Sequence, residues 1–172
     1  MVDLNRRALL KGRLRPGSSP QTQPIRMPWL IAEDAFTDRC TRCQACQQAC
    51  PEQIIIRADG GYPELDFQRG ECTFCRACAD SCPEPLFRDA GEAPWQQIAS
   101  MSETLCLAHN NVMCRSCEDS CEPQAISFRP QAGRVARPLI DPDLCNGCGA
   151  CVSSCPQQAI TLTKTSEVPY GG

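Results

Sequence analysis

Sixteen cysteines among 172 residues constrain this chain more than any other feature, because they fall into four groups of four. Three groups share the spacing C-x2-C-x2-C-x3-C-P, which is typical of thiolates that hold cubane iron–sulfur clusters. The third group keeps C-x2-C-x3-C, but its first cysteine lies eight positions upstream of its second. In chain order the groups are Cys40, Cys43, Cys46 and Cys50; Cys72, Cys75, Cys78 and Cys82; Cys106, Cys114, Cys117 and Cys121; and Cys145, Cys148, Cys151 and Cys155.

Metal binding explains this spacing better than disulfide bonding does. An even number of cysteines also suits a disulfide scaffold, and the other apolar residues are few for an independent core. Three cysteines separated by two residues, however, converge on a metal more easily than they disperse into bridges. Zinc sites pair C-x2-C with a distant second pair or with histidines, whereas this chain has one histidine, His109, which we expect to be a solvent-facing loop residue. Iron–sulfur clusters require reduced thiols, and hence a reducing compartment.

The ligand sets follow from the rule that, in two-cluster ferredoxins, the fourth cysteine of a run binds the other cluster. Sequential pairing predicts four sets: Cys40, Cys43, Cys46 and Cys82; Cys50, Cys72, Cys75 and Cys78; Cys121, Cys145, Cys148 and Cys151; and Cys106, Cys114, Cys117 and Cys155. A nested pairing, with groups one and four around groups two and three, remains open. Cys106 can also be a buried free thiol. We therefore expect four [4Fe–4S] clusters, or three if the Cys106 group is not a full site.

An internal repeat predicts the fold. Residues 54–67 and 126–141 each consist of two short β-prone runs around a glycine-containing turn, which indicates two hairpins. Two-stranded hairpins are marginal alone, so we expect an α+β fold of two tandem ferredoxin-like dicluster halves that the clusters stabilise. Trp95–Met101 is predicted to form a short linking helix, with Trp95 packed inward. The predicted units are a basic flexible arm (1–28), a first half (29–92), a linker helix (93–105), a second half (106–165) and a tail (166–172).

Charge and the remaining motifs exclude several functions. Residues 1–26 carry a net charge of +5 and the remainder −8, so the acidic core disfavours nucleic acid, and the basic arm is either a solvated tail or a docking segment. Residues 5–11 (N-R-R-A-L-L-K) are similar to a twin-arginine export signal, but no apolar stretch follows them and no run could span a membrane. We expect a cytoplasmic, uncleaved protein. No nucleophile–base pair, carboxylate dyad or phosphate loop is evident, so we expect no enzymatic activity.

Several segments together resemble a known family. They are N-R-R-A-L-L-K-G-R at 5–13, G-G-Y-P at 60–63, C-N-G-C-G-A-C at 145–151 and, most specifically, C-R-S-C-E-D-S-C-E-P at 114–123. Over roughly residues 5–162 the chain resembles the NapF family, the ferredoxin-type accessory proteins of the periplasmic nitrate reductase system. The resemblance implies a cytoplasmic protein that binds the precursor of the molybdenum-containing catalytic subunit and assists its maturation by cluster insertion before export. The alternative is an electron-transfer subunit that delivers electrons to an oxidoreductase.

Overall fold

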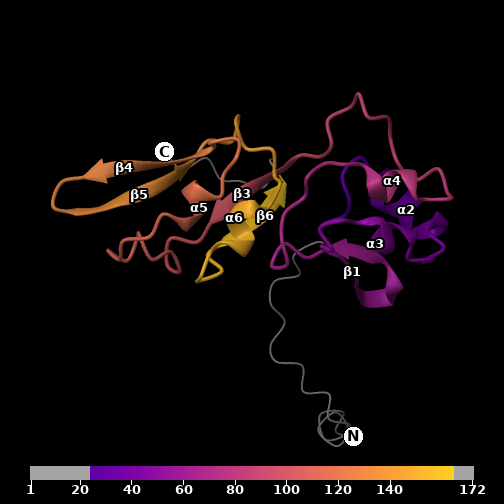
Figure 1. Cartoon of the computed structure of the whole chain (residues 1–172), viewed down its shortest axis with the longest axis horizontal. Helices are drawn as coiled ribbons and strands as arrows, with labels where there is room; N and C mark the ends of the chain where they lie inside the picture. Colours follow the sequence, from indigo (N-terminus) through magenta and orange to yellow (C-terminus); the bar gives the residue numbers. More distant parts are fainter. Residues whose placement is uncertain (1–23, 165–172) are drawn as a thin grey trace, which may run out of the picture.

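The computed structural model describes residues 24–164 as two α+β halves made of short elements, as the sequence predicts. Figure 1 shows the earlier half in indigo and magenta beside the later half in orange and yellow. Residues 1–23 and 165–172, which include most of the predicted arm and the tail, lie outside the described residues. The elements are α2 (Glu33–Arg39), α3 (Ala45–Ala49), β1 (Ile55–Arg57), η1 (Asp59–Gly61), β2 (Pro63–Leu65), α4 (Ala77–Asp80), β3 (Gln97–Met101), α5 (Ser116–Asp119), β4 (Ile126–Gln131), β5 (Arg134–Ile140), α6 (Ala150–Ser153) and β6 (Ile160–Lys164).

Both predicted hairpins are present. β1 and β2 pair antiparallel, with Ile55 opposite Leu65, and the turn η1 joins them. β4 and β5 form a longer antiparallel hairpin, with Ile126 opposite Ile140 and a tight turn at Gly133, whose φ is +67°. In Figure 1 this second hairpin projects from the body of the later half.

One short helix accompanies each cysteine group. The helices α3, α4, α5 and α6 each begin after the second cysteine of a group, contain its third cysteine and end before its fourth. In three of the groups a proline follows the fourth cysteine, where a residue without an amide hydrogen does not continue a helix. The sequence did not predict α2, which buries Phe36 and ends immediately before Cys40.

The predicted linker helix is wrong, because residues 97–101 form the strand β3. This strand pairs antiparallel with β6, with Gln97 opposite Lys164 and Met101 opposite Ile160. The spacing of Trp95, Ile98 and Met101 fits one face of a helix, but a strand about 60 residues later supplies hydrogen-bond partners for the backbone. Residues 97–101 therefore belong to the second half and do not form a separate connection.

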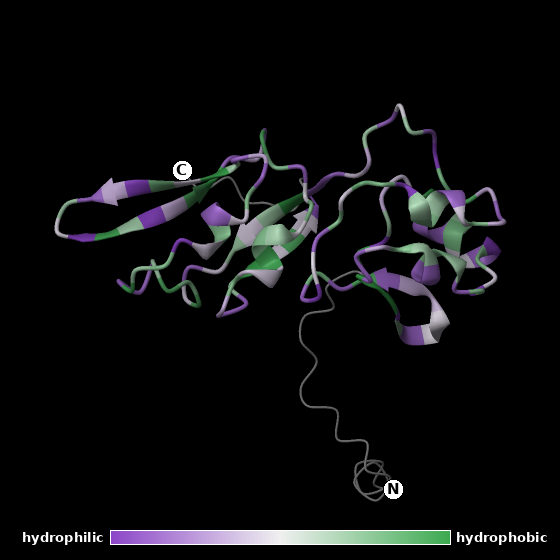
Figure 2. Cartoon of the chain, viewed as in Figure 1, coloured by the Kyte–Doolittle hydropathy of each residue, from purple (hydrophilic) through white to green (hydrophobic). Residues whose placement is uncertain are grey.

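The core continues across both halves. Met27, Ile54 and Phe67 of the first half lie in one buried cluster with Val152 and Ile160 of the second. Figure 2 shows hydrophobic residues spread over short elements of both halves. The core is therefore built from many short elements and not on the face of one large sheet.

The predicted boundary of the flexible arm at residue 28 is also wrong. Met27 is 3% exposed, Pro28 is fully buried, and the backbone of Ile25 accepts a hydrogen bond from the Leu65 amide at 2.8 Å. Arg26 forms hydrogen bonds with both carboxylate oxygens of Glu33. Residues 25–28 thus belong to the first half, and the Arg26 charge is neutralised within it.

Candidate iron–sulfur sites

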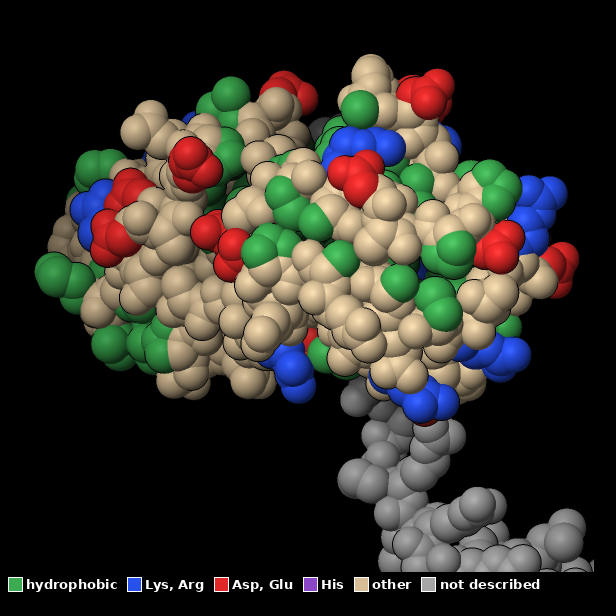
Figure 3. All heavy atoms as spheres, turned by 45° about the vertical axis from the view of Figure 1, so that its right-hand side comes forward, with side chains coloured by type: hydrophobic (Ala, Val, Ile, Leu, Met, Phe, Trp, Pro, Cys, Tyr) green, Lys and Arg blue, Asp and Glu red, His purple; other side chains and the backbone are tan. Residues whose placement is uncertain are grey.

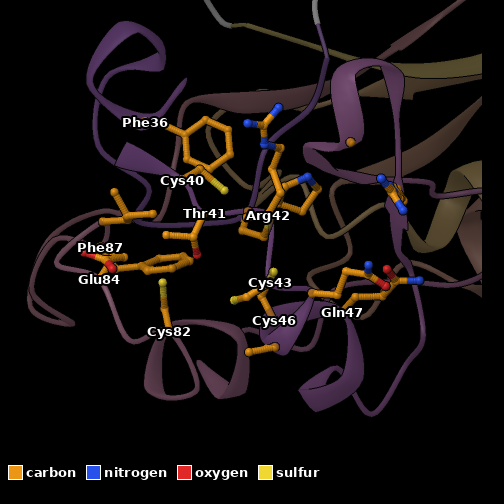
Figure 4. A pocket seen from close by; sticks show the side chains of 17 residues that line it. Phe36, Cys40, Thr41, Arg42, Cys43, Cys46, Gln47, Cys82, Glu84 and Phe87 are labelled. Carbon is orange, nitrogen blue, oxygen red and sulfur yellow. The ribbon is translucent and has the colours of Figure 1, made fainter. Parts of the chain in front are cut away.

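The first predicted set of thiols surrounds one cavity. Cys40, Cys43 and Cys46 come from the loop after α2 and from α3, and Cys82 follows α4. These four cysteines line a space of about 500 Å³, together with apolar residues such as Phe36 and Phe87. Figure 4 shows the labelled side chains of this cavity, with Cys82 on a different chain segment from the other three cysteines. Two cysteine groups therefore contribute to the first cavity.

The other three predicted sets behave in the same way. Each lines its own cavity, with volumes of about 380, 320 and 340 Å³ for the second, third and fourth. The lining thiols are Cys50, Cys72, Cys75 and Cys78; Cys121, Cys145, Cys148 and Cys151; and Cys106, Cys114, Cys117 and Cys155. The structure thus groups all sixteen thiols sequentially rather than in the nested arrangement. Cys106 lies with its predicted set and not alone.

The spread of the thiols around each cavity fits a multi-iron cluster. A tetrahedral zinc ion with sulfurs at about 2.3 Å would require them to lie about 3.8 Å from one another. Among residues 24–164, no three His, Cys, Asp or Glu side chains converge closely enough to hold a single metal ion. In a [4Fe–4S] cluster each thiolate binds a different iron, so the four thiols surround the cluster and do not meet at a point. The donor type and number, four thiols on each cavity, fit [4Fe–4S] clusters.

The loops between the cysteines adopt an unusual backbone conformation. Positive φ angles occur just before the second cysteine and just after it in groups one, two and four. The residues are Arg42, Gln44, Phe74, Arg76, Gly147 and Gly149. Such angles are uncommon for residues other than glycine, and they recur in backbone nests whose amides face anions and iron–sulfur clusters. The sequence indicated this geometry only at the two glycines.

Backbone amides already donate to the thiols in these loops. Cys43, Cys72 and Cys148 each accept a hydrogen bond from the amide two residues later. The Ala99 amide of β3 lies 3.4 Å from Cys145 Sγ, and the Ala159 amide lies 3.3 Å from Cys155 Sγ. Hydrogen bonds to cluster sulfurs help to set reduction potentials, so the backbone supplies this control as well as the ligands.

Burial changes how readily the thiols ionise. Desolvation raises the pKa of Cys46, Cys72 and Cys117 to about 11, and that of Cys78 and Cys151 to about 12. The exposed Cys43 differs, because hydrogen bonds from the Ala45 amide and the Thr41 side chain lower its pKa. These five buried thiols are therefore protonated at neutral pH and must lose a proton when they bind iron.

The second and third cavities meet at the contact between the two halves. The Cys72 amide donates a hydrogen bond to the Cys148 carbonyl at 2.8 Å. Gly149 packs so closely on Phe67 that a Cβ atom there would lie 2.0 Å from the ring. Trp95 Nε1 donates to the Asn146 carbonyl at 2.9 Å, and its ring packs edge-on against Phe67. The inward packing predicted for Trp95 is thus realised at the contact between the halves, and the four cavities follow one another in series.

Comparisons with known proteins agree with this arrangement. Two family models described as 4Fe-4S dicluster domain match residues 39–87 and 112–159. The ferredoxin-type protein NapF of Escherichia coli K12 is 46% identical over 160 residues, which cover 93% of this chain and 94% of that protein. The protein of the same name from Haemophilus influenzae is 42% identical over 171 residues, which cover 96% and 97% of the two chains.

This chain belongs to the NapF family. A more distant relative is the methylamine utilization ferredoxin-type protein MauM of Methylobacillus flagellatus, which is 28% identical over 159 residues, covering 83% of this chain and 68% of that protein. Two dicluster domains and sixteen cysteines give this member of the NapF family four [4Fe–4S] clusters, as predicted.

Two features set the third cysteine group of this NapF-family chain apart. The domain match at residues 112–159 begins after Cys106, although this thiol lines the fourth cavity. His109 lies in the loop between Cys106 and Cys114. Its side chain is only 12% exposed, and its Nδ1 lies 3.6 Å from a carboxylate oxygen of Glu103. The prediction of a solvent-facing histidine is therefore wrong. His109 does not line the fourth cavity.

In residues 24–164, no helix has the length and hydrophobicity needed to cross a membrane.

Proposed function

We propose that this protein is a non-enzymatic accessory protein that binds the precursor of the periplasmic nitrate reductase catalytic subunit and assists cluster insertion before export. The observation that carries this proposal is the set of four four-thiol cavities in a chain of the NapF family. Binding takes place in the cytoplasm, where thiols remain reduced. The protein has no catalytic residues of its own in this proposal.

The sixteen cysteines are the proposed ligands, four for each cluster in the sequential sets. Grouping around separate cavities supports this assignment, and the inclusion of Cys106 rests on its place in the fourth cavity. When bound, the clusters supply iron, sulfide and redox capacity. The protein supplies the thiolates, the backbone amides that face them and the apolar walls that limit contact with water.

Residues 105–113, called the third-group loop below, support a role with a dedicated partner. Leu105, Val112 and Met113 of this segment are 52%, 50% and 83% exposed. Large apolar side chains that are exposed within one short stretch of the chain are candidates for contact with another macromolecule. A simple electron carrier has no need of such a loop.

Electron delivery to an oxidoreductase is the second candidate function. It is favoured by the order of the four cavities, which follow one another through the contact at Cys72 and Cys148. This order suits a carrier that accepts electrons at one end of the molecule and releases them at the other.

Capture experiments distinguish these functions. The tagged, iron-loaded protein is used as bait with extracts of cells that respire nitrate, in which export of the reductase has been blocked. We expect the unexported precursor of the catalytic subunit to be recovered, and the mature exported subunit to be absent. Recovery of a respiratory oxidoreductase in place of the precursor would support the electron-transfer function and overturn the accessory one.

A further inference from the structure

A groove of about 1220 Å³ lies between the third-group loop and the β4–β5 hairpin. Met113 and Cys114 line one wall, and Phe128, Arg134 and Val135 of the hairpin line the other. The groove is larger than any of the four thiol cavities and is open to solvent. Its chemistry is set by three features: the exposed Met113, the basic Arg134 and the adjacent fourth site.

The loop side of the groove carries the apolar side chain of Met113 beside the polar Asn111. Met113 is 83% exposed, and its neighbour Val112 is 50% exposed. Methionine is flexible and polarizable, and it is common at surfaces that adapt to a partner. Arg115, also on this side, lies with its guanidinium 4.8 Å from the centre of the Phe128 ring of the hairpin, and it forms an ion pair with Glu118.

The hairpin side is basic. Residues 126–140 contain three arginines and no acidic residue, although the whole chain has a net charge of −3. No ion pair within residues 24–164 involves these arginines. Of these three arginines, Arg134 lines the groove, whereas Arg129 and Arg137 lie opposite each other farther along the hairpin and do not line it. Figure 3 shows basic and acidic side chains interspersed over the face that it presents.

We propose that this groove binds an acidic segment of the partner protein, with an apolar side chain of that segment packed against Met113. The inference rests on the proposed function, because the partner in question is the reductase precursor. An acidic segment would pair with Arg134, which lines the groove. Basic side chains attract such a segment over a distance and increase the association rate.

Binding here brings the partner to the wall of the fourth site. Cys114 and Phe128 line both the groove and the fourth cavity. A segment seated in the groove therefore contacts the same residues that enclose this site from the other side. Of the four cluster sites, the fourth is therefore the one that the proposed partner would contact.

The test compares Arg134→Glu with Arg39→Glu in the full-length, iron-loaded protein. Arg39 is an exposed arginine at the end of α2 in the first half, so the control makes the same change of charge far from the groove. The probe is the purified precursor of the periplasmic nitrate reductase catalytic subunit. Affinity is measured by surface plasmon resonance at about 50 mM and about 300 mM salt, because exposed charges are screened at the higher concentration.

We expect Arg134→Glu to weaken binding about tenfold at low salt and less at high salt, while Arg39→Glu stays close to the wild type. Met113→Ser should weaken binding about fivefold at both salt concentrations, since it removes apolar contact area. Iron content and thermal unfolding show whether each variant keeps its fold.

Three outcomes would overturn the inference. If the wild type binds the precursor and Arg134→Glu binds it equally well with full iron content, the groove is not the docking surface. If the wild type does not bind the precursor at all, the proposed function fails and this inference fails with it. Self-association that Arg134→Glu abolishes, measured by sedimentation, would assign the groove to a second copy of the chain.

Discussion

Gly149 lies at the contact between the two halves, and adding a single methyl group there tests how closely that contact is packed. A Cβ there would lie 2.0 Å from a ring carbon of Phe67, and φ is +87°. Gly149→Ala should therefore add overpacking, about 1–3 kcal/mol, to the left-handed strain of about 1–2 kcal/mol. Gly133→Ala is the matched control, because φ is +67° but nothing lies within 4 Å. Thermal unfolding of the loaded proteins should show the larger loss for Gly149→Ala, and equal losses would mean that Phe67 moves aside freely.

The buried thiols make iron loading dependent on pH. Because burial raises the pKa of Cys72 to about 11 and that of Cys78 to about 12, both thiols are protonated at neutral pH. Iron binds the thiolate, so protons compete with iron, and loading should become more favourable as the pH rises from about 7 to about 9. Proton release during anaerobic reconstitution in weakly buffered solution measures this directly. Loading without proton release at pH 7 would contradict the predicted ligand set.

Replacing Cys106 tests whether the third-group loop supplies a ligand to the fourth cluster. The loop is closed by its own hydrogen bonds, including those from Asn110 Nδ2 to the Cys106 and Thr104 carbonyls, so it can hold the Cys106 thiol against the fourth cavity. We expect the purified protein to contain about sixteen irons, and Cys106→Ala about twelve. Leu105→Ala, a change at an exposed neighbour, should leave the count unchanged. If Cys106→Ala still contains about sixteen irons, Cys106 is not a ligand and has only a structural role.

Local patterns predicted most of the elements that carry the thiols. Cysteine spacing predicted the four sets, and the β-prone runs around Gly60 and Gly133 predicted both hairpins. The strand β3 was missed because its partner β6 lies about 60 residues later, so its hydrogen bonds depend on tertiary pairing. The left-handed residues Arg42 and Gln44 were missed because their side chains favour other backbone angles, and the loop around the cavity imposes theirs.

At the scale of the whole molecule, we expect folding to depend on the clusters, because the regular elements are short. The chain contains three two-stranded sheets and helices of four to seven residues within residues 24–164. Such sheets are marginal alone, and metal binding in small domains is coupled to folding. Removal of iron with a chelator should abolish the cooperative thermal transition seen by circular dichroism, and anaerobic reconstitution should restore it. A sharp transition in the iron-free protein would show that the apolar core is sufficient.

Because the Cys72 amide donates a hydrogen bond to the Cys148 carbonyl, we expect metal binding in the two halves to be thermodynamically linked. Metal in the third site would fix the Cys148 loop, and the Cys72 loop would then lose less entropy in reaching its own binding conformation. Linkage of this kind is reciprocal, so the second site must favour the third by the same factor. Native mass spectrometry of partly loaded protein should therefore show empty and full chains in excess, and chains with one half filled should be rarer than random loading predicts.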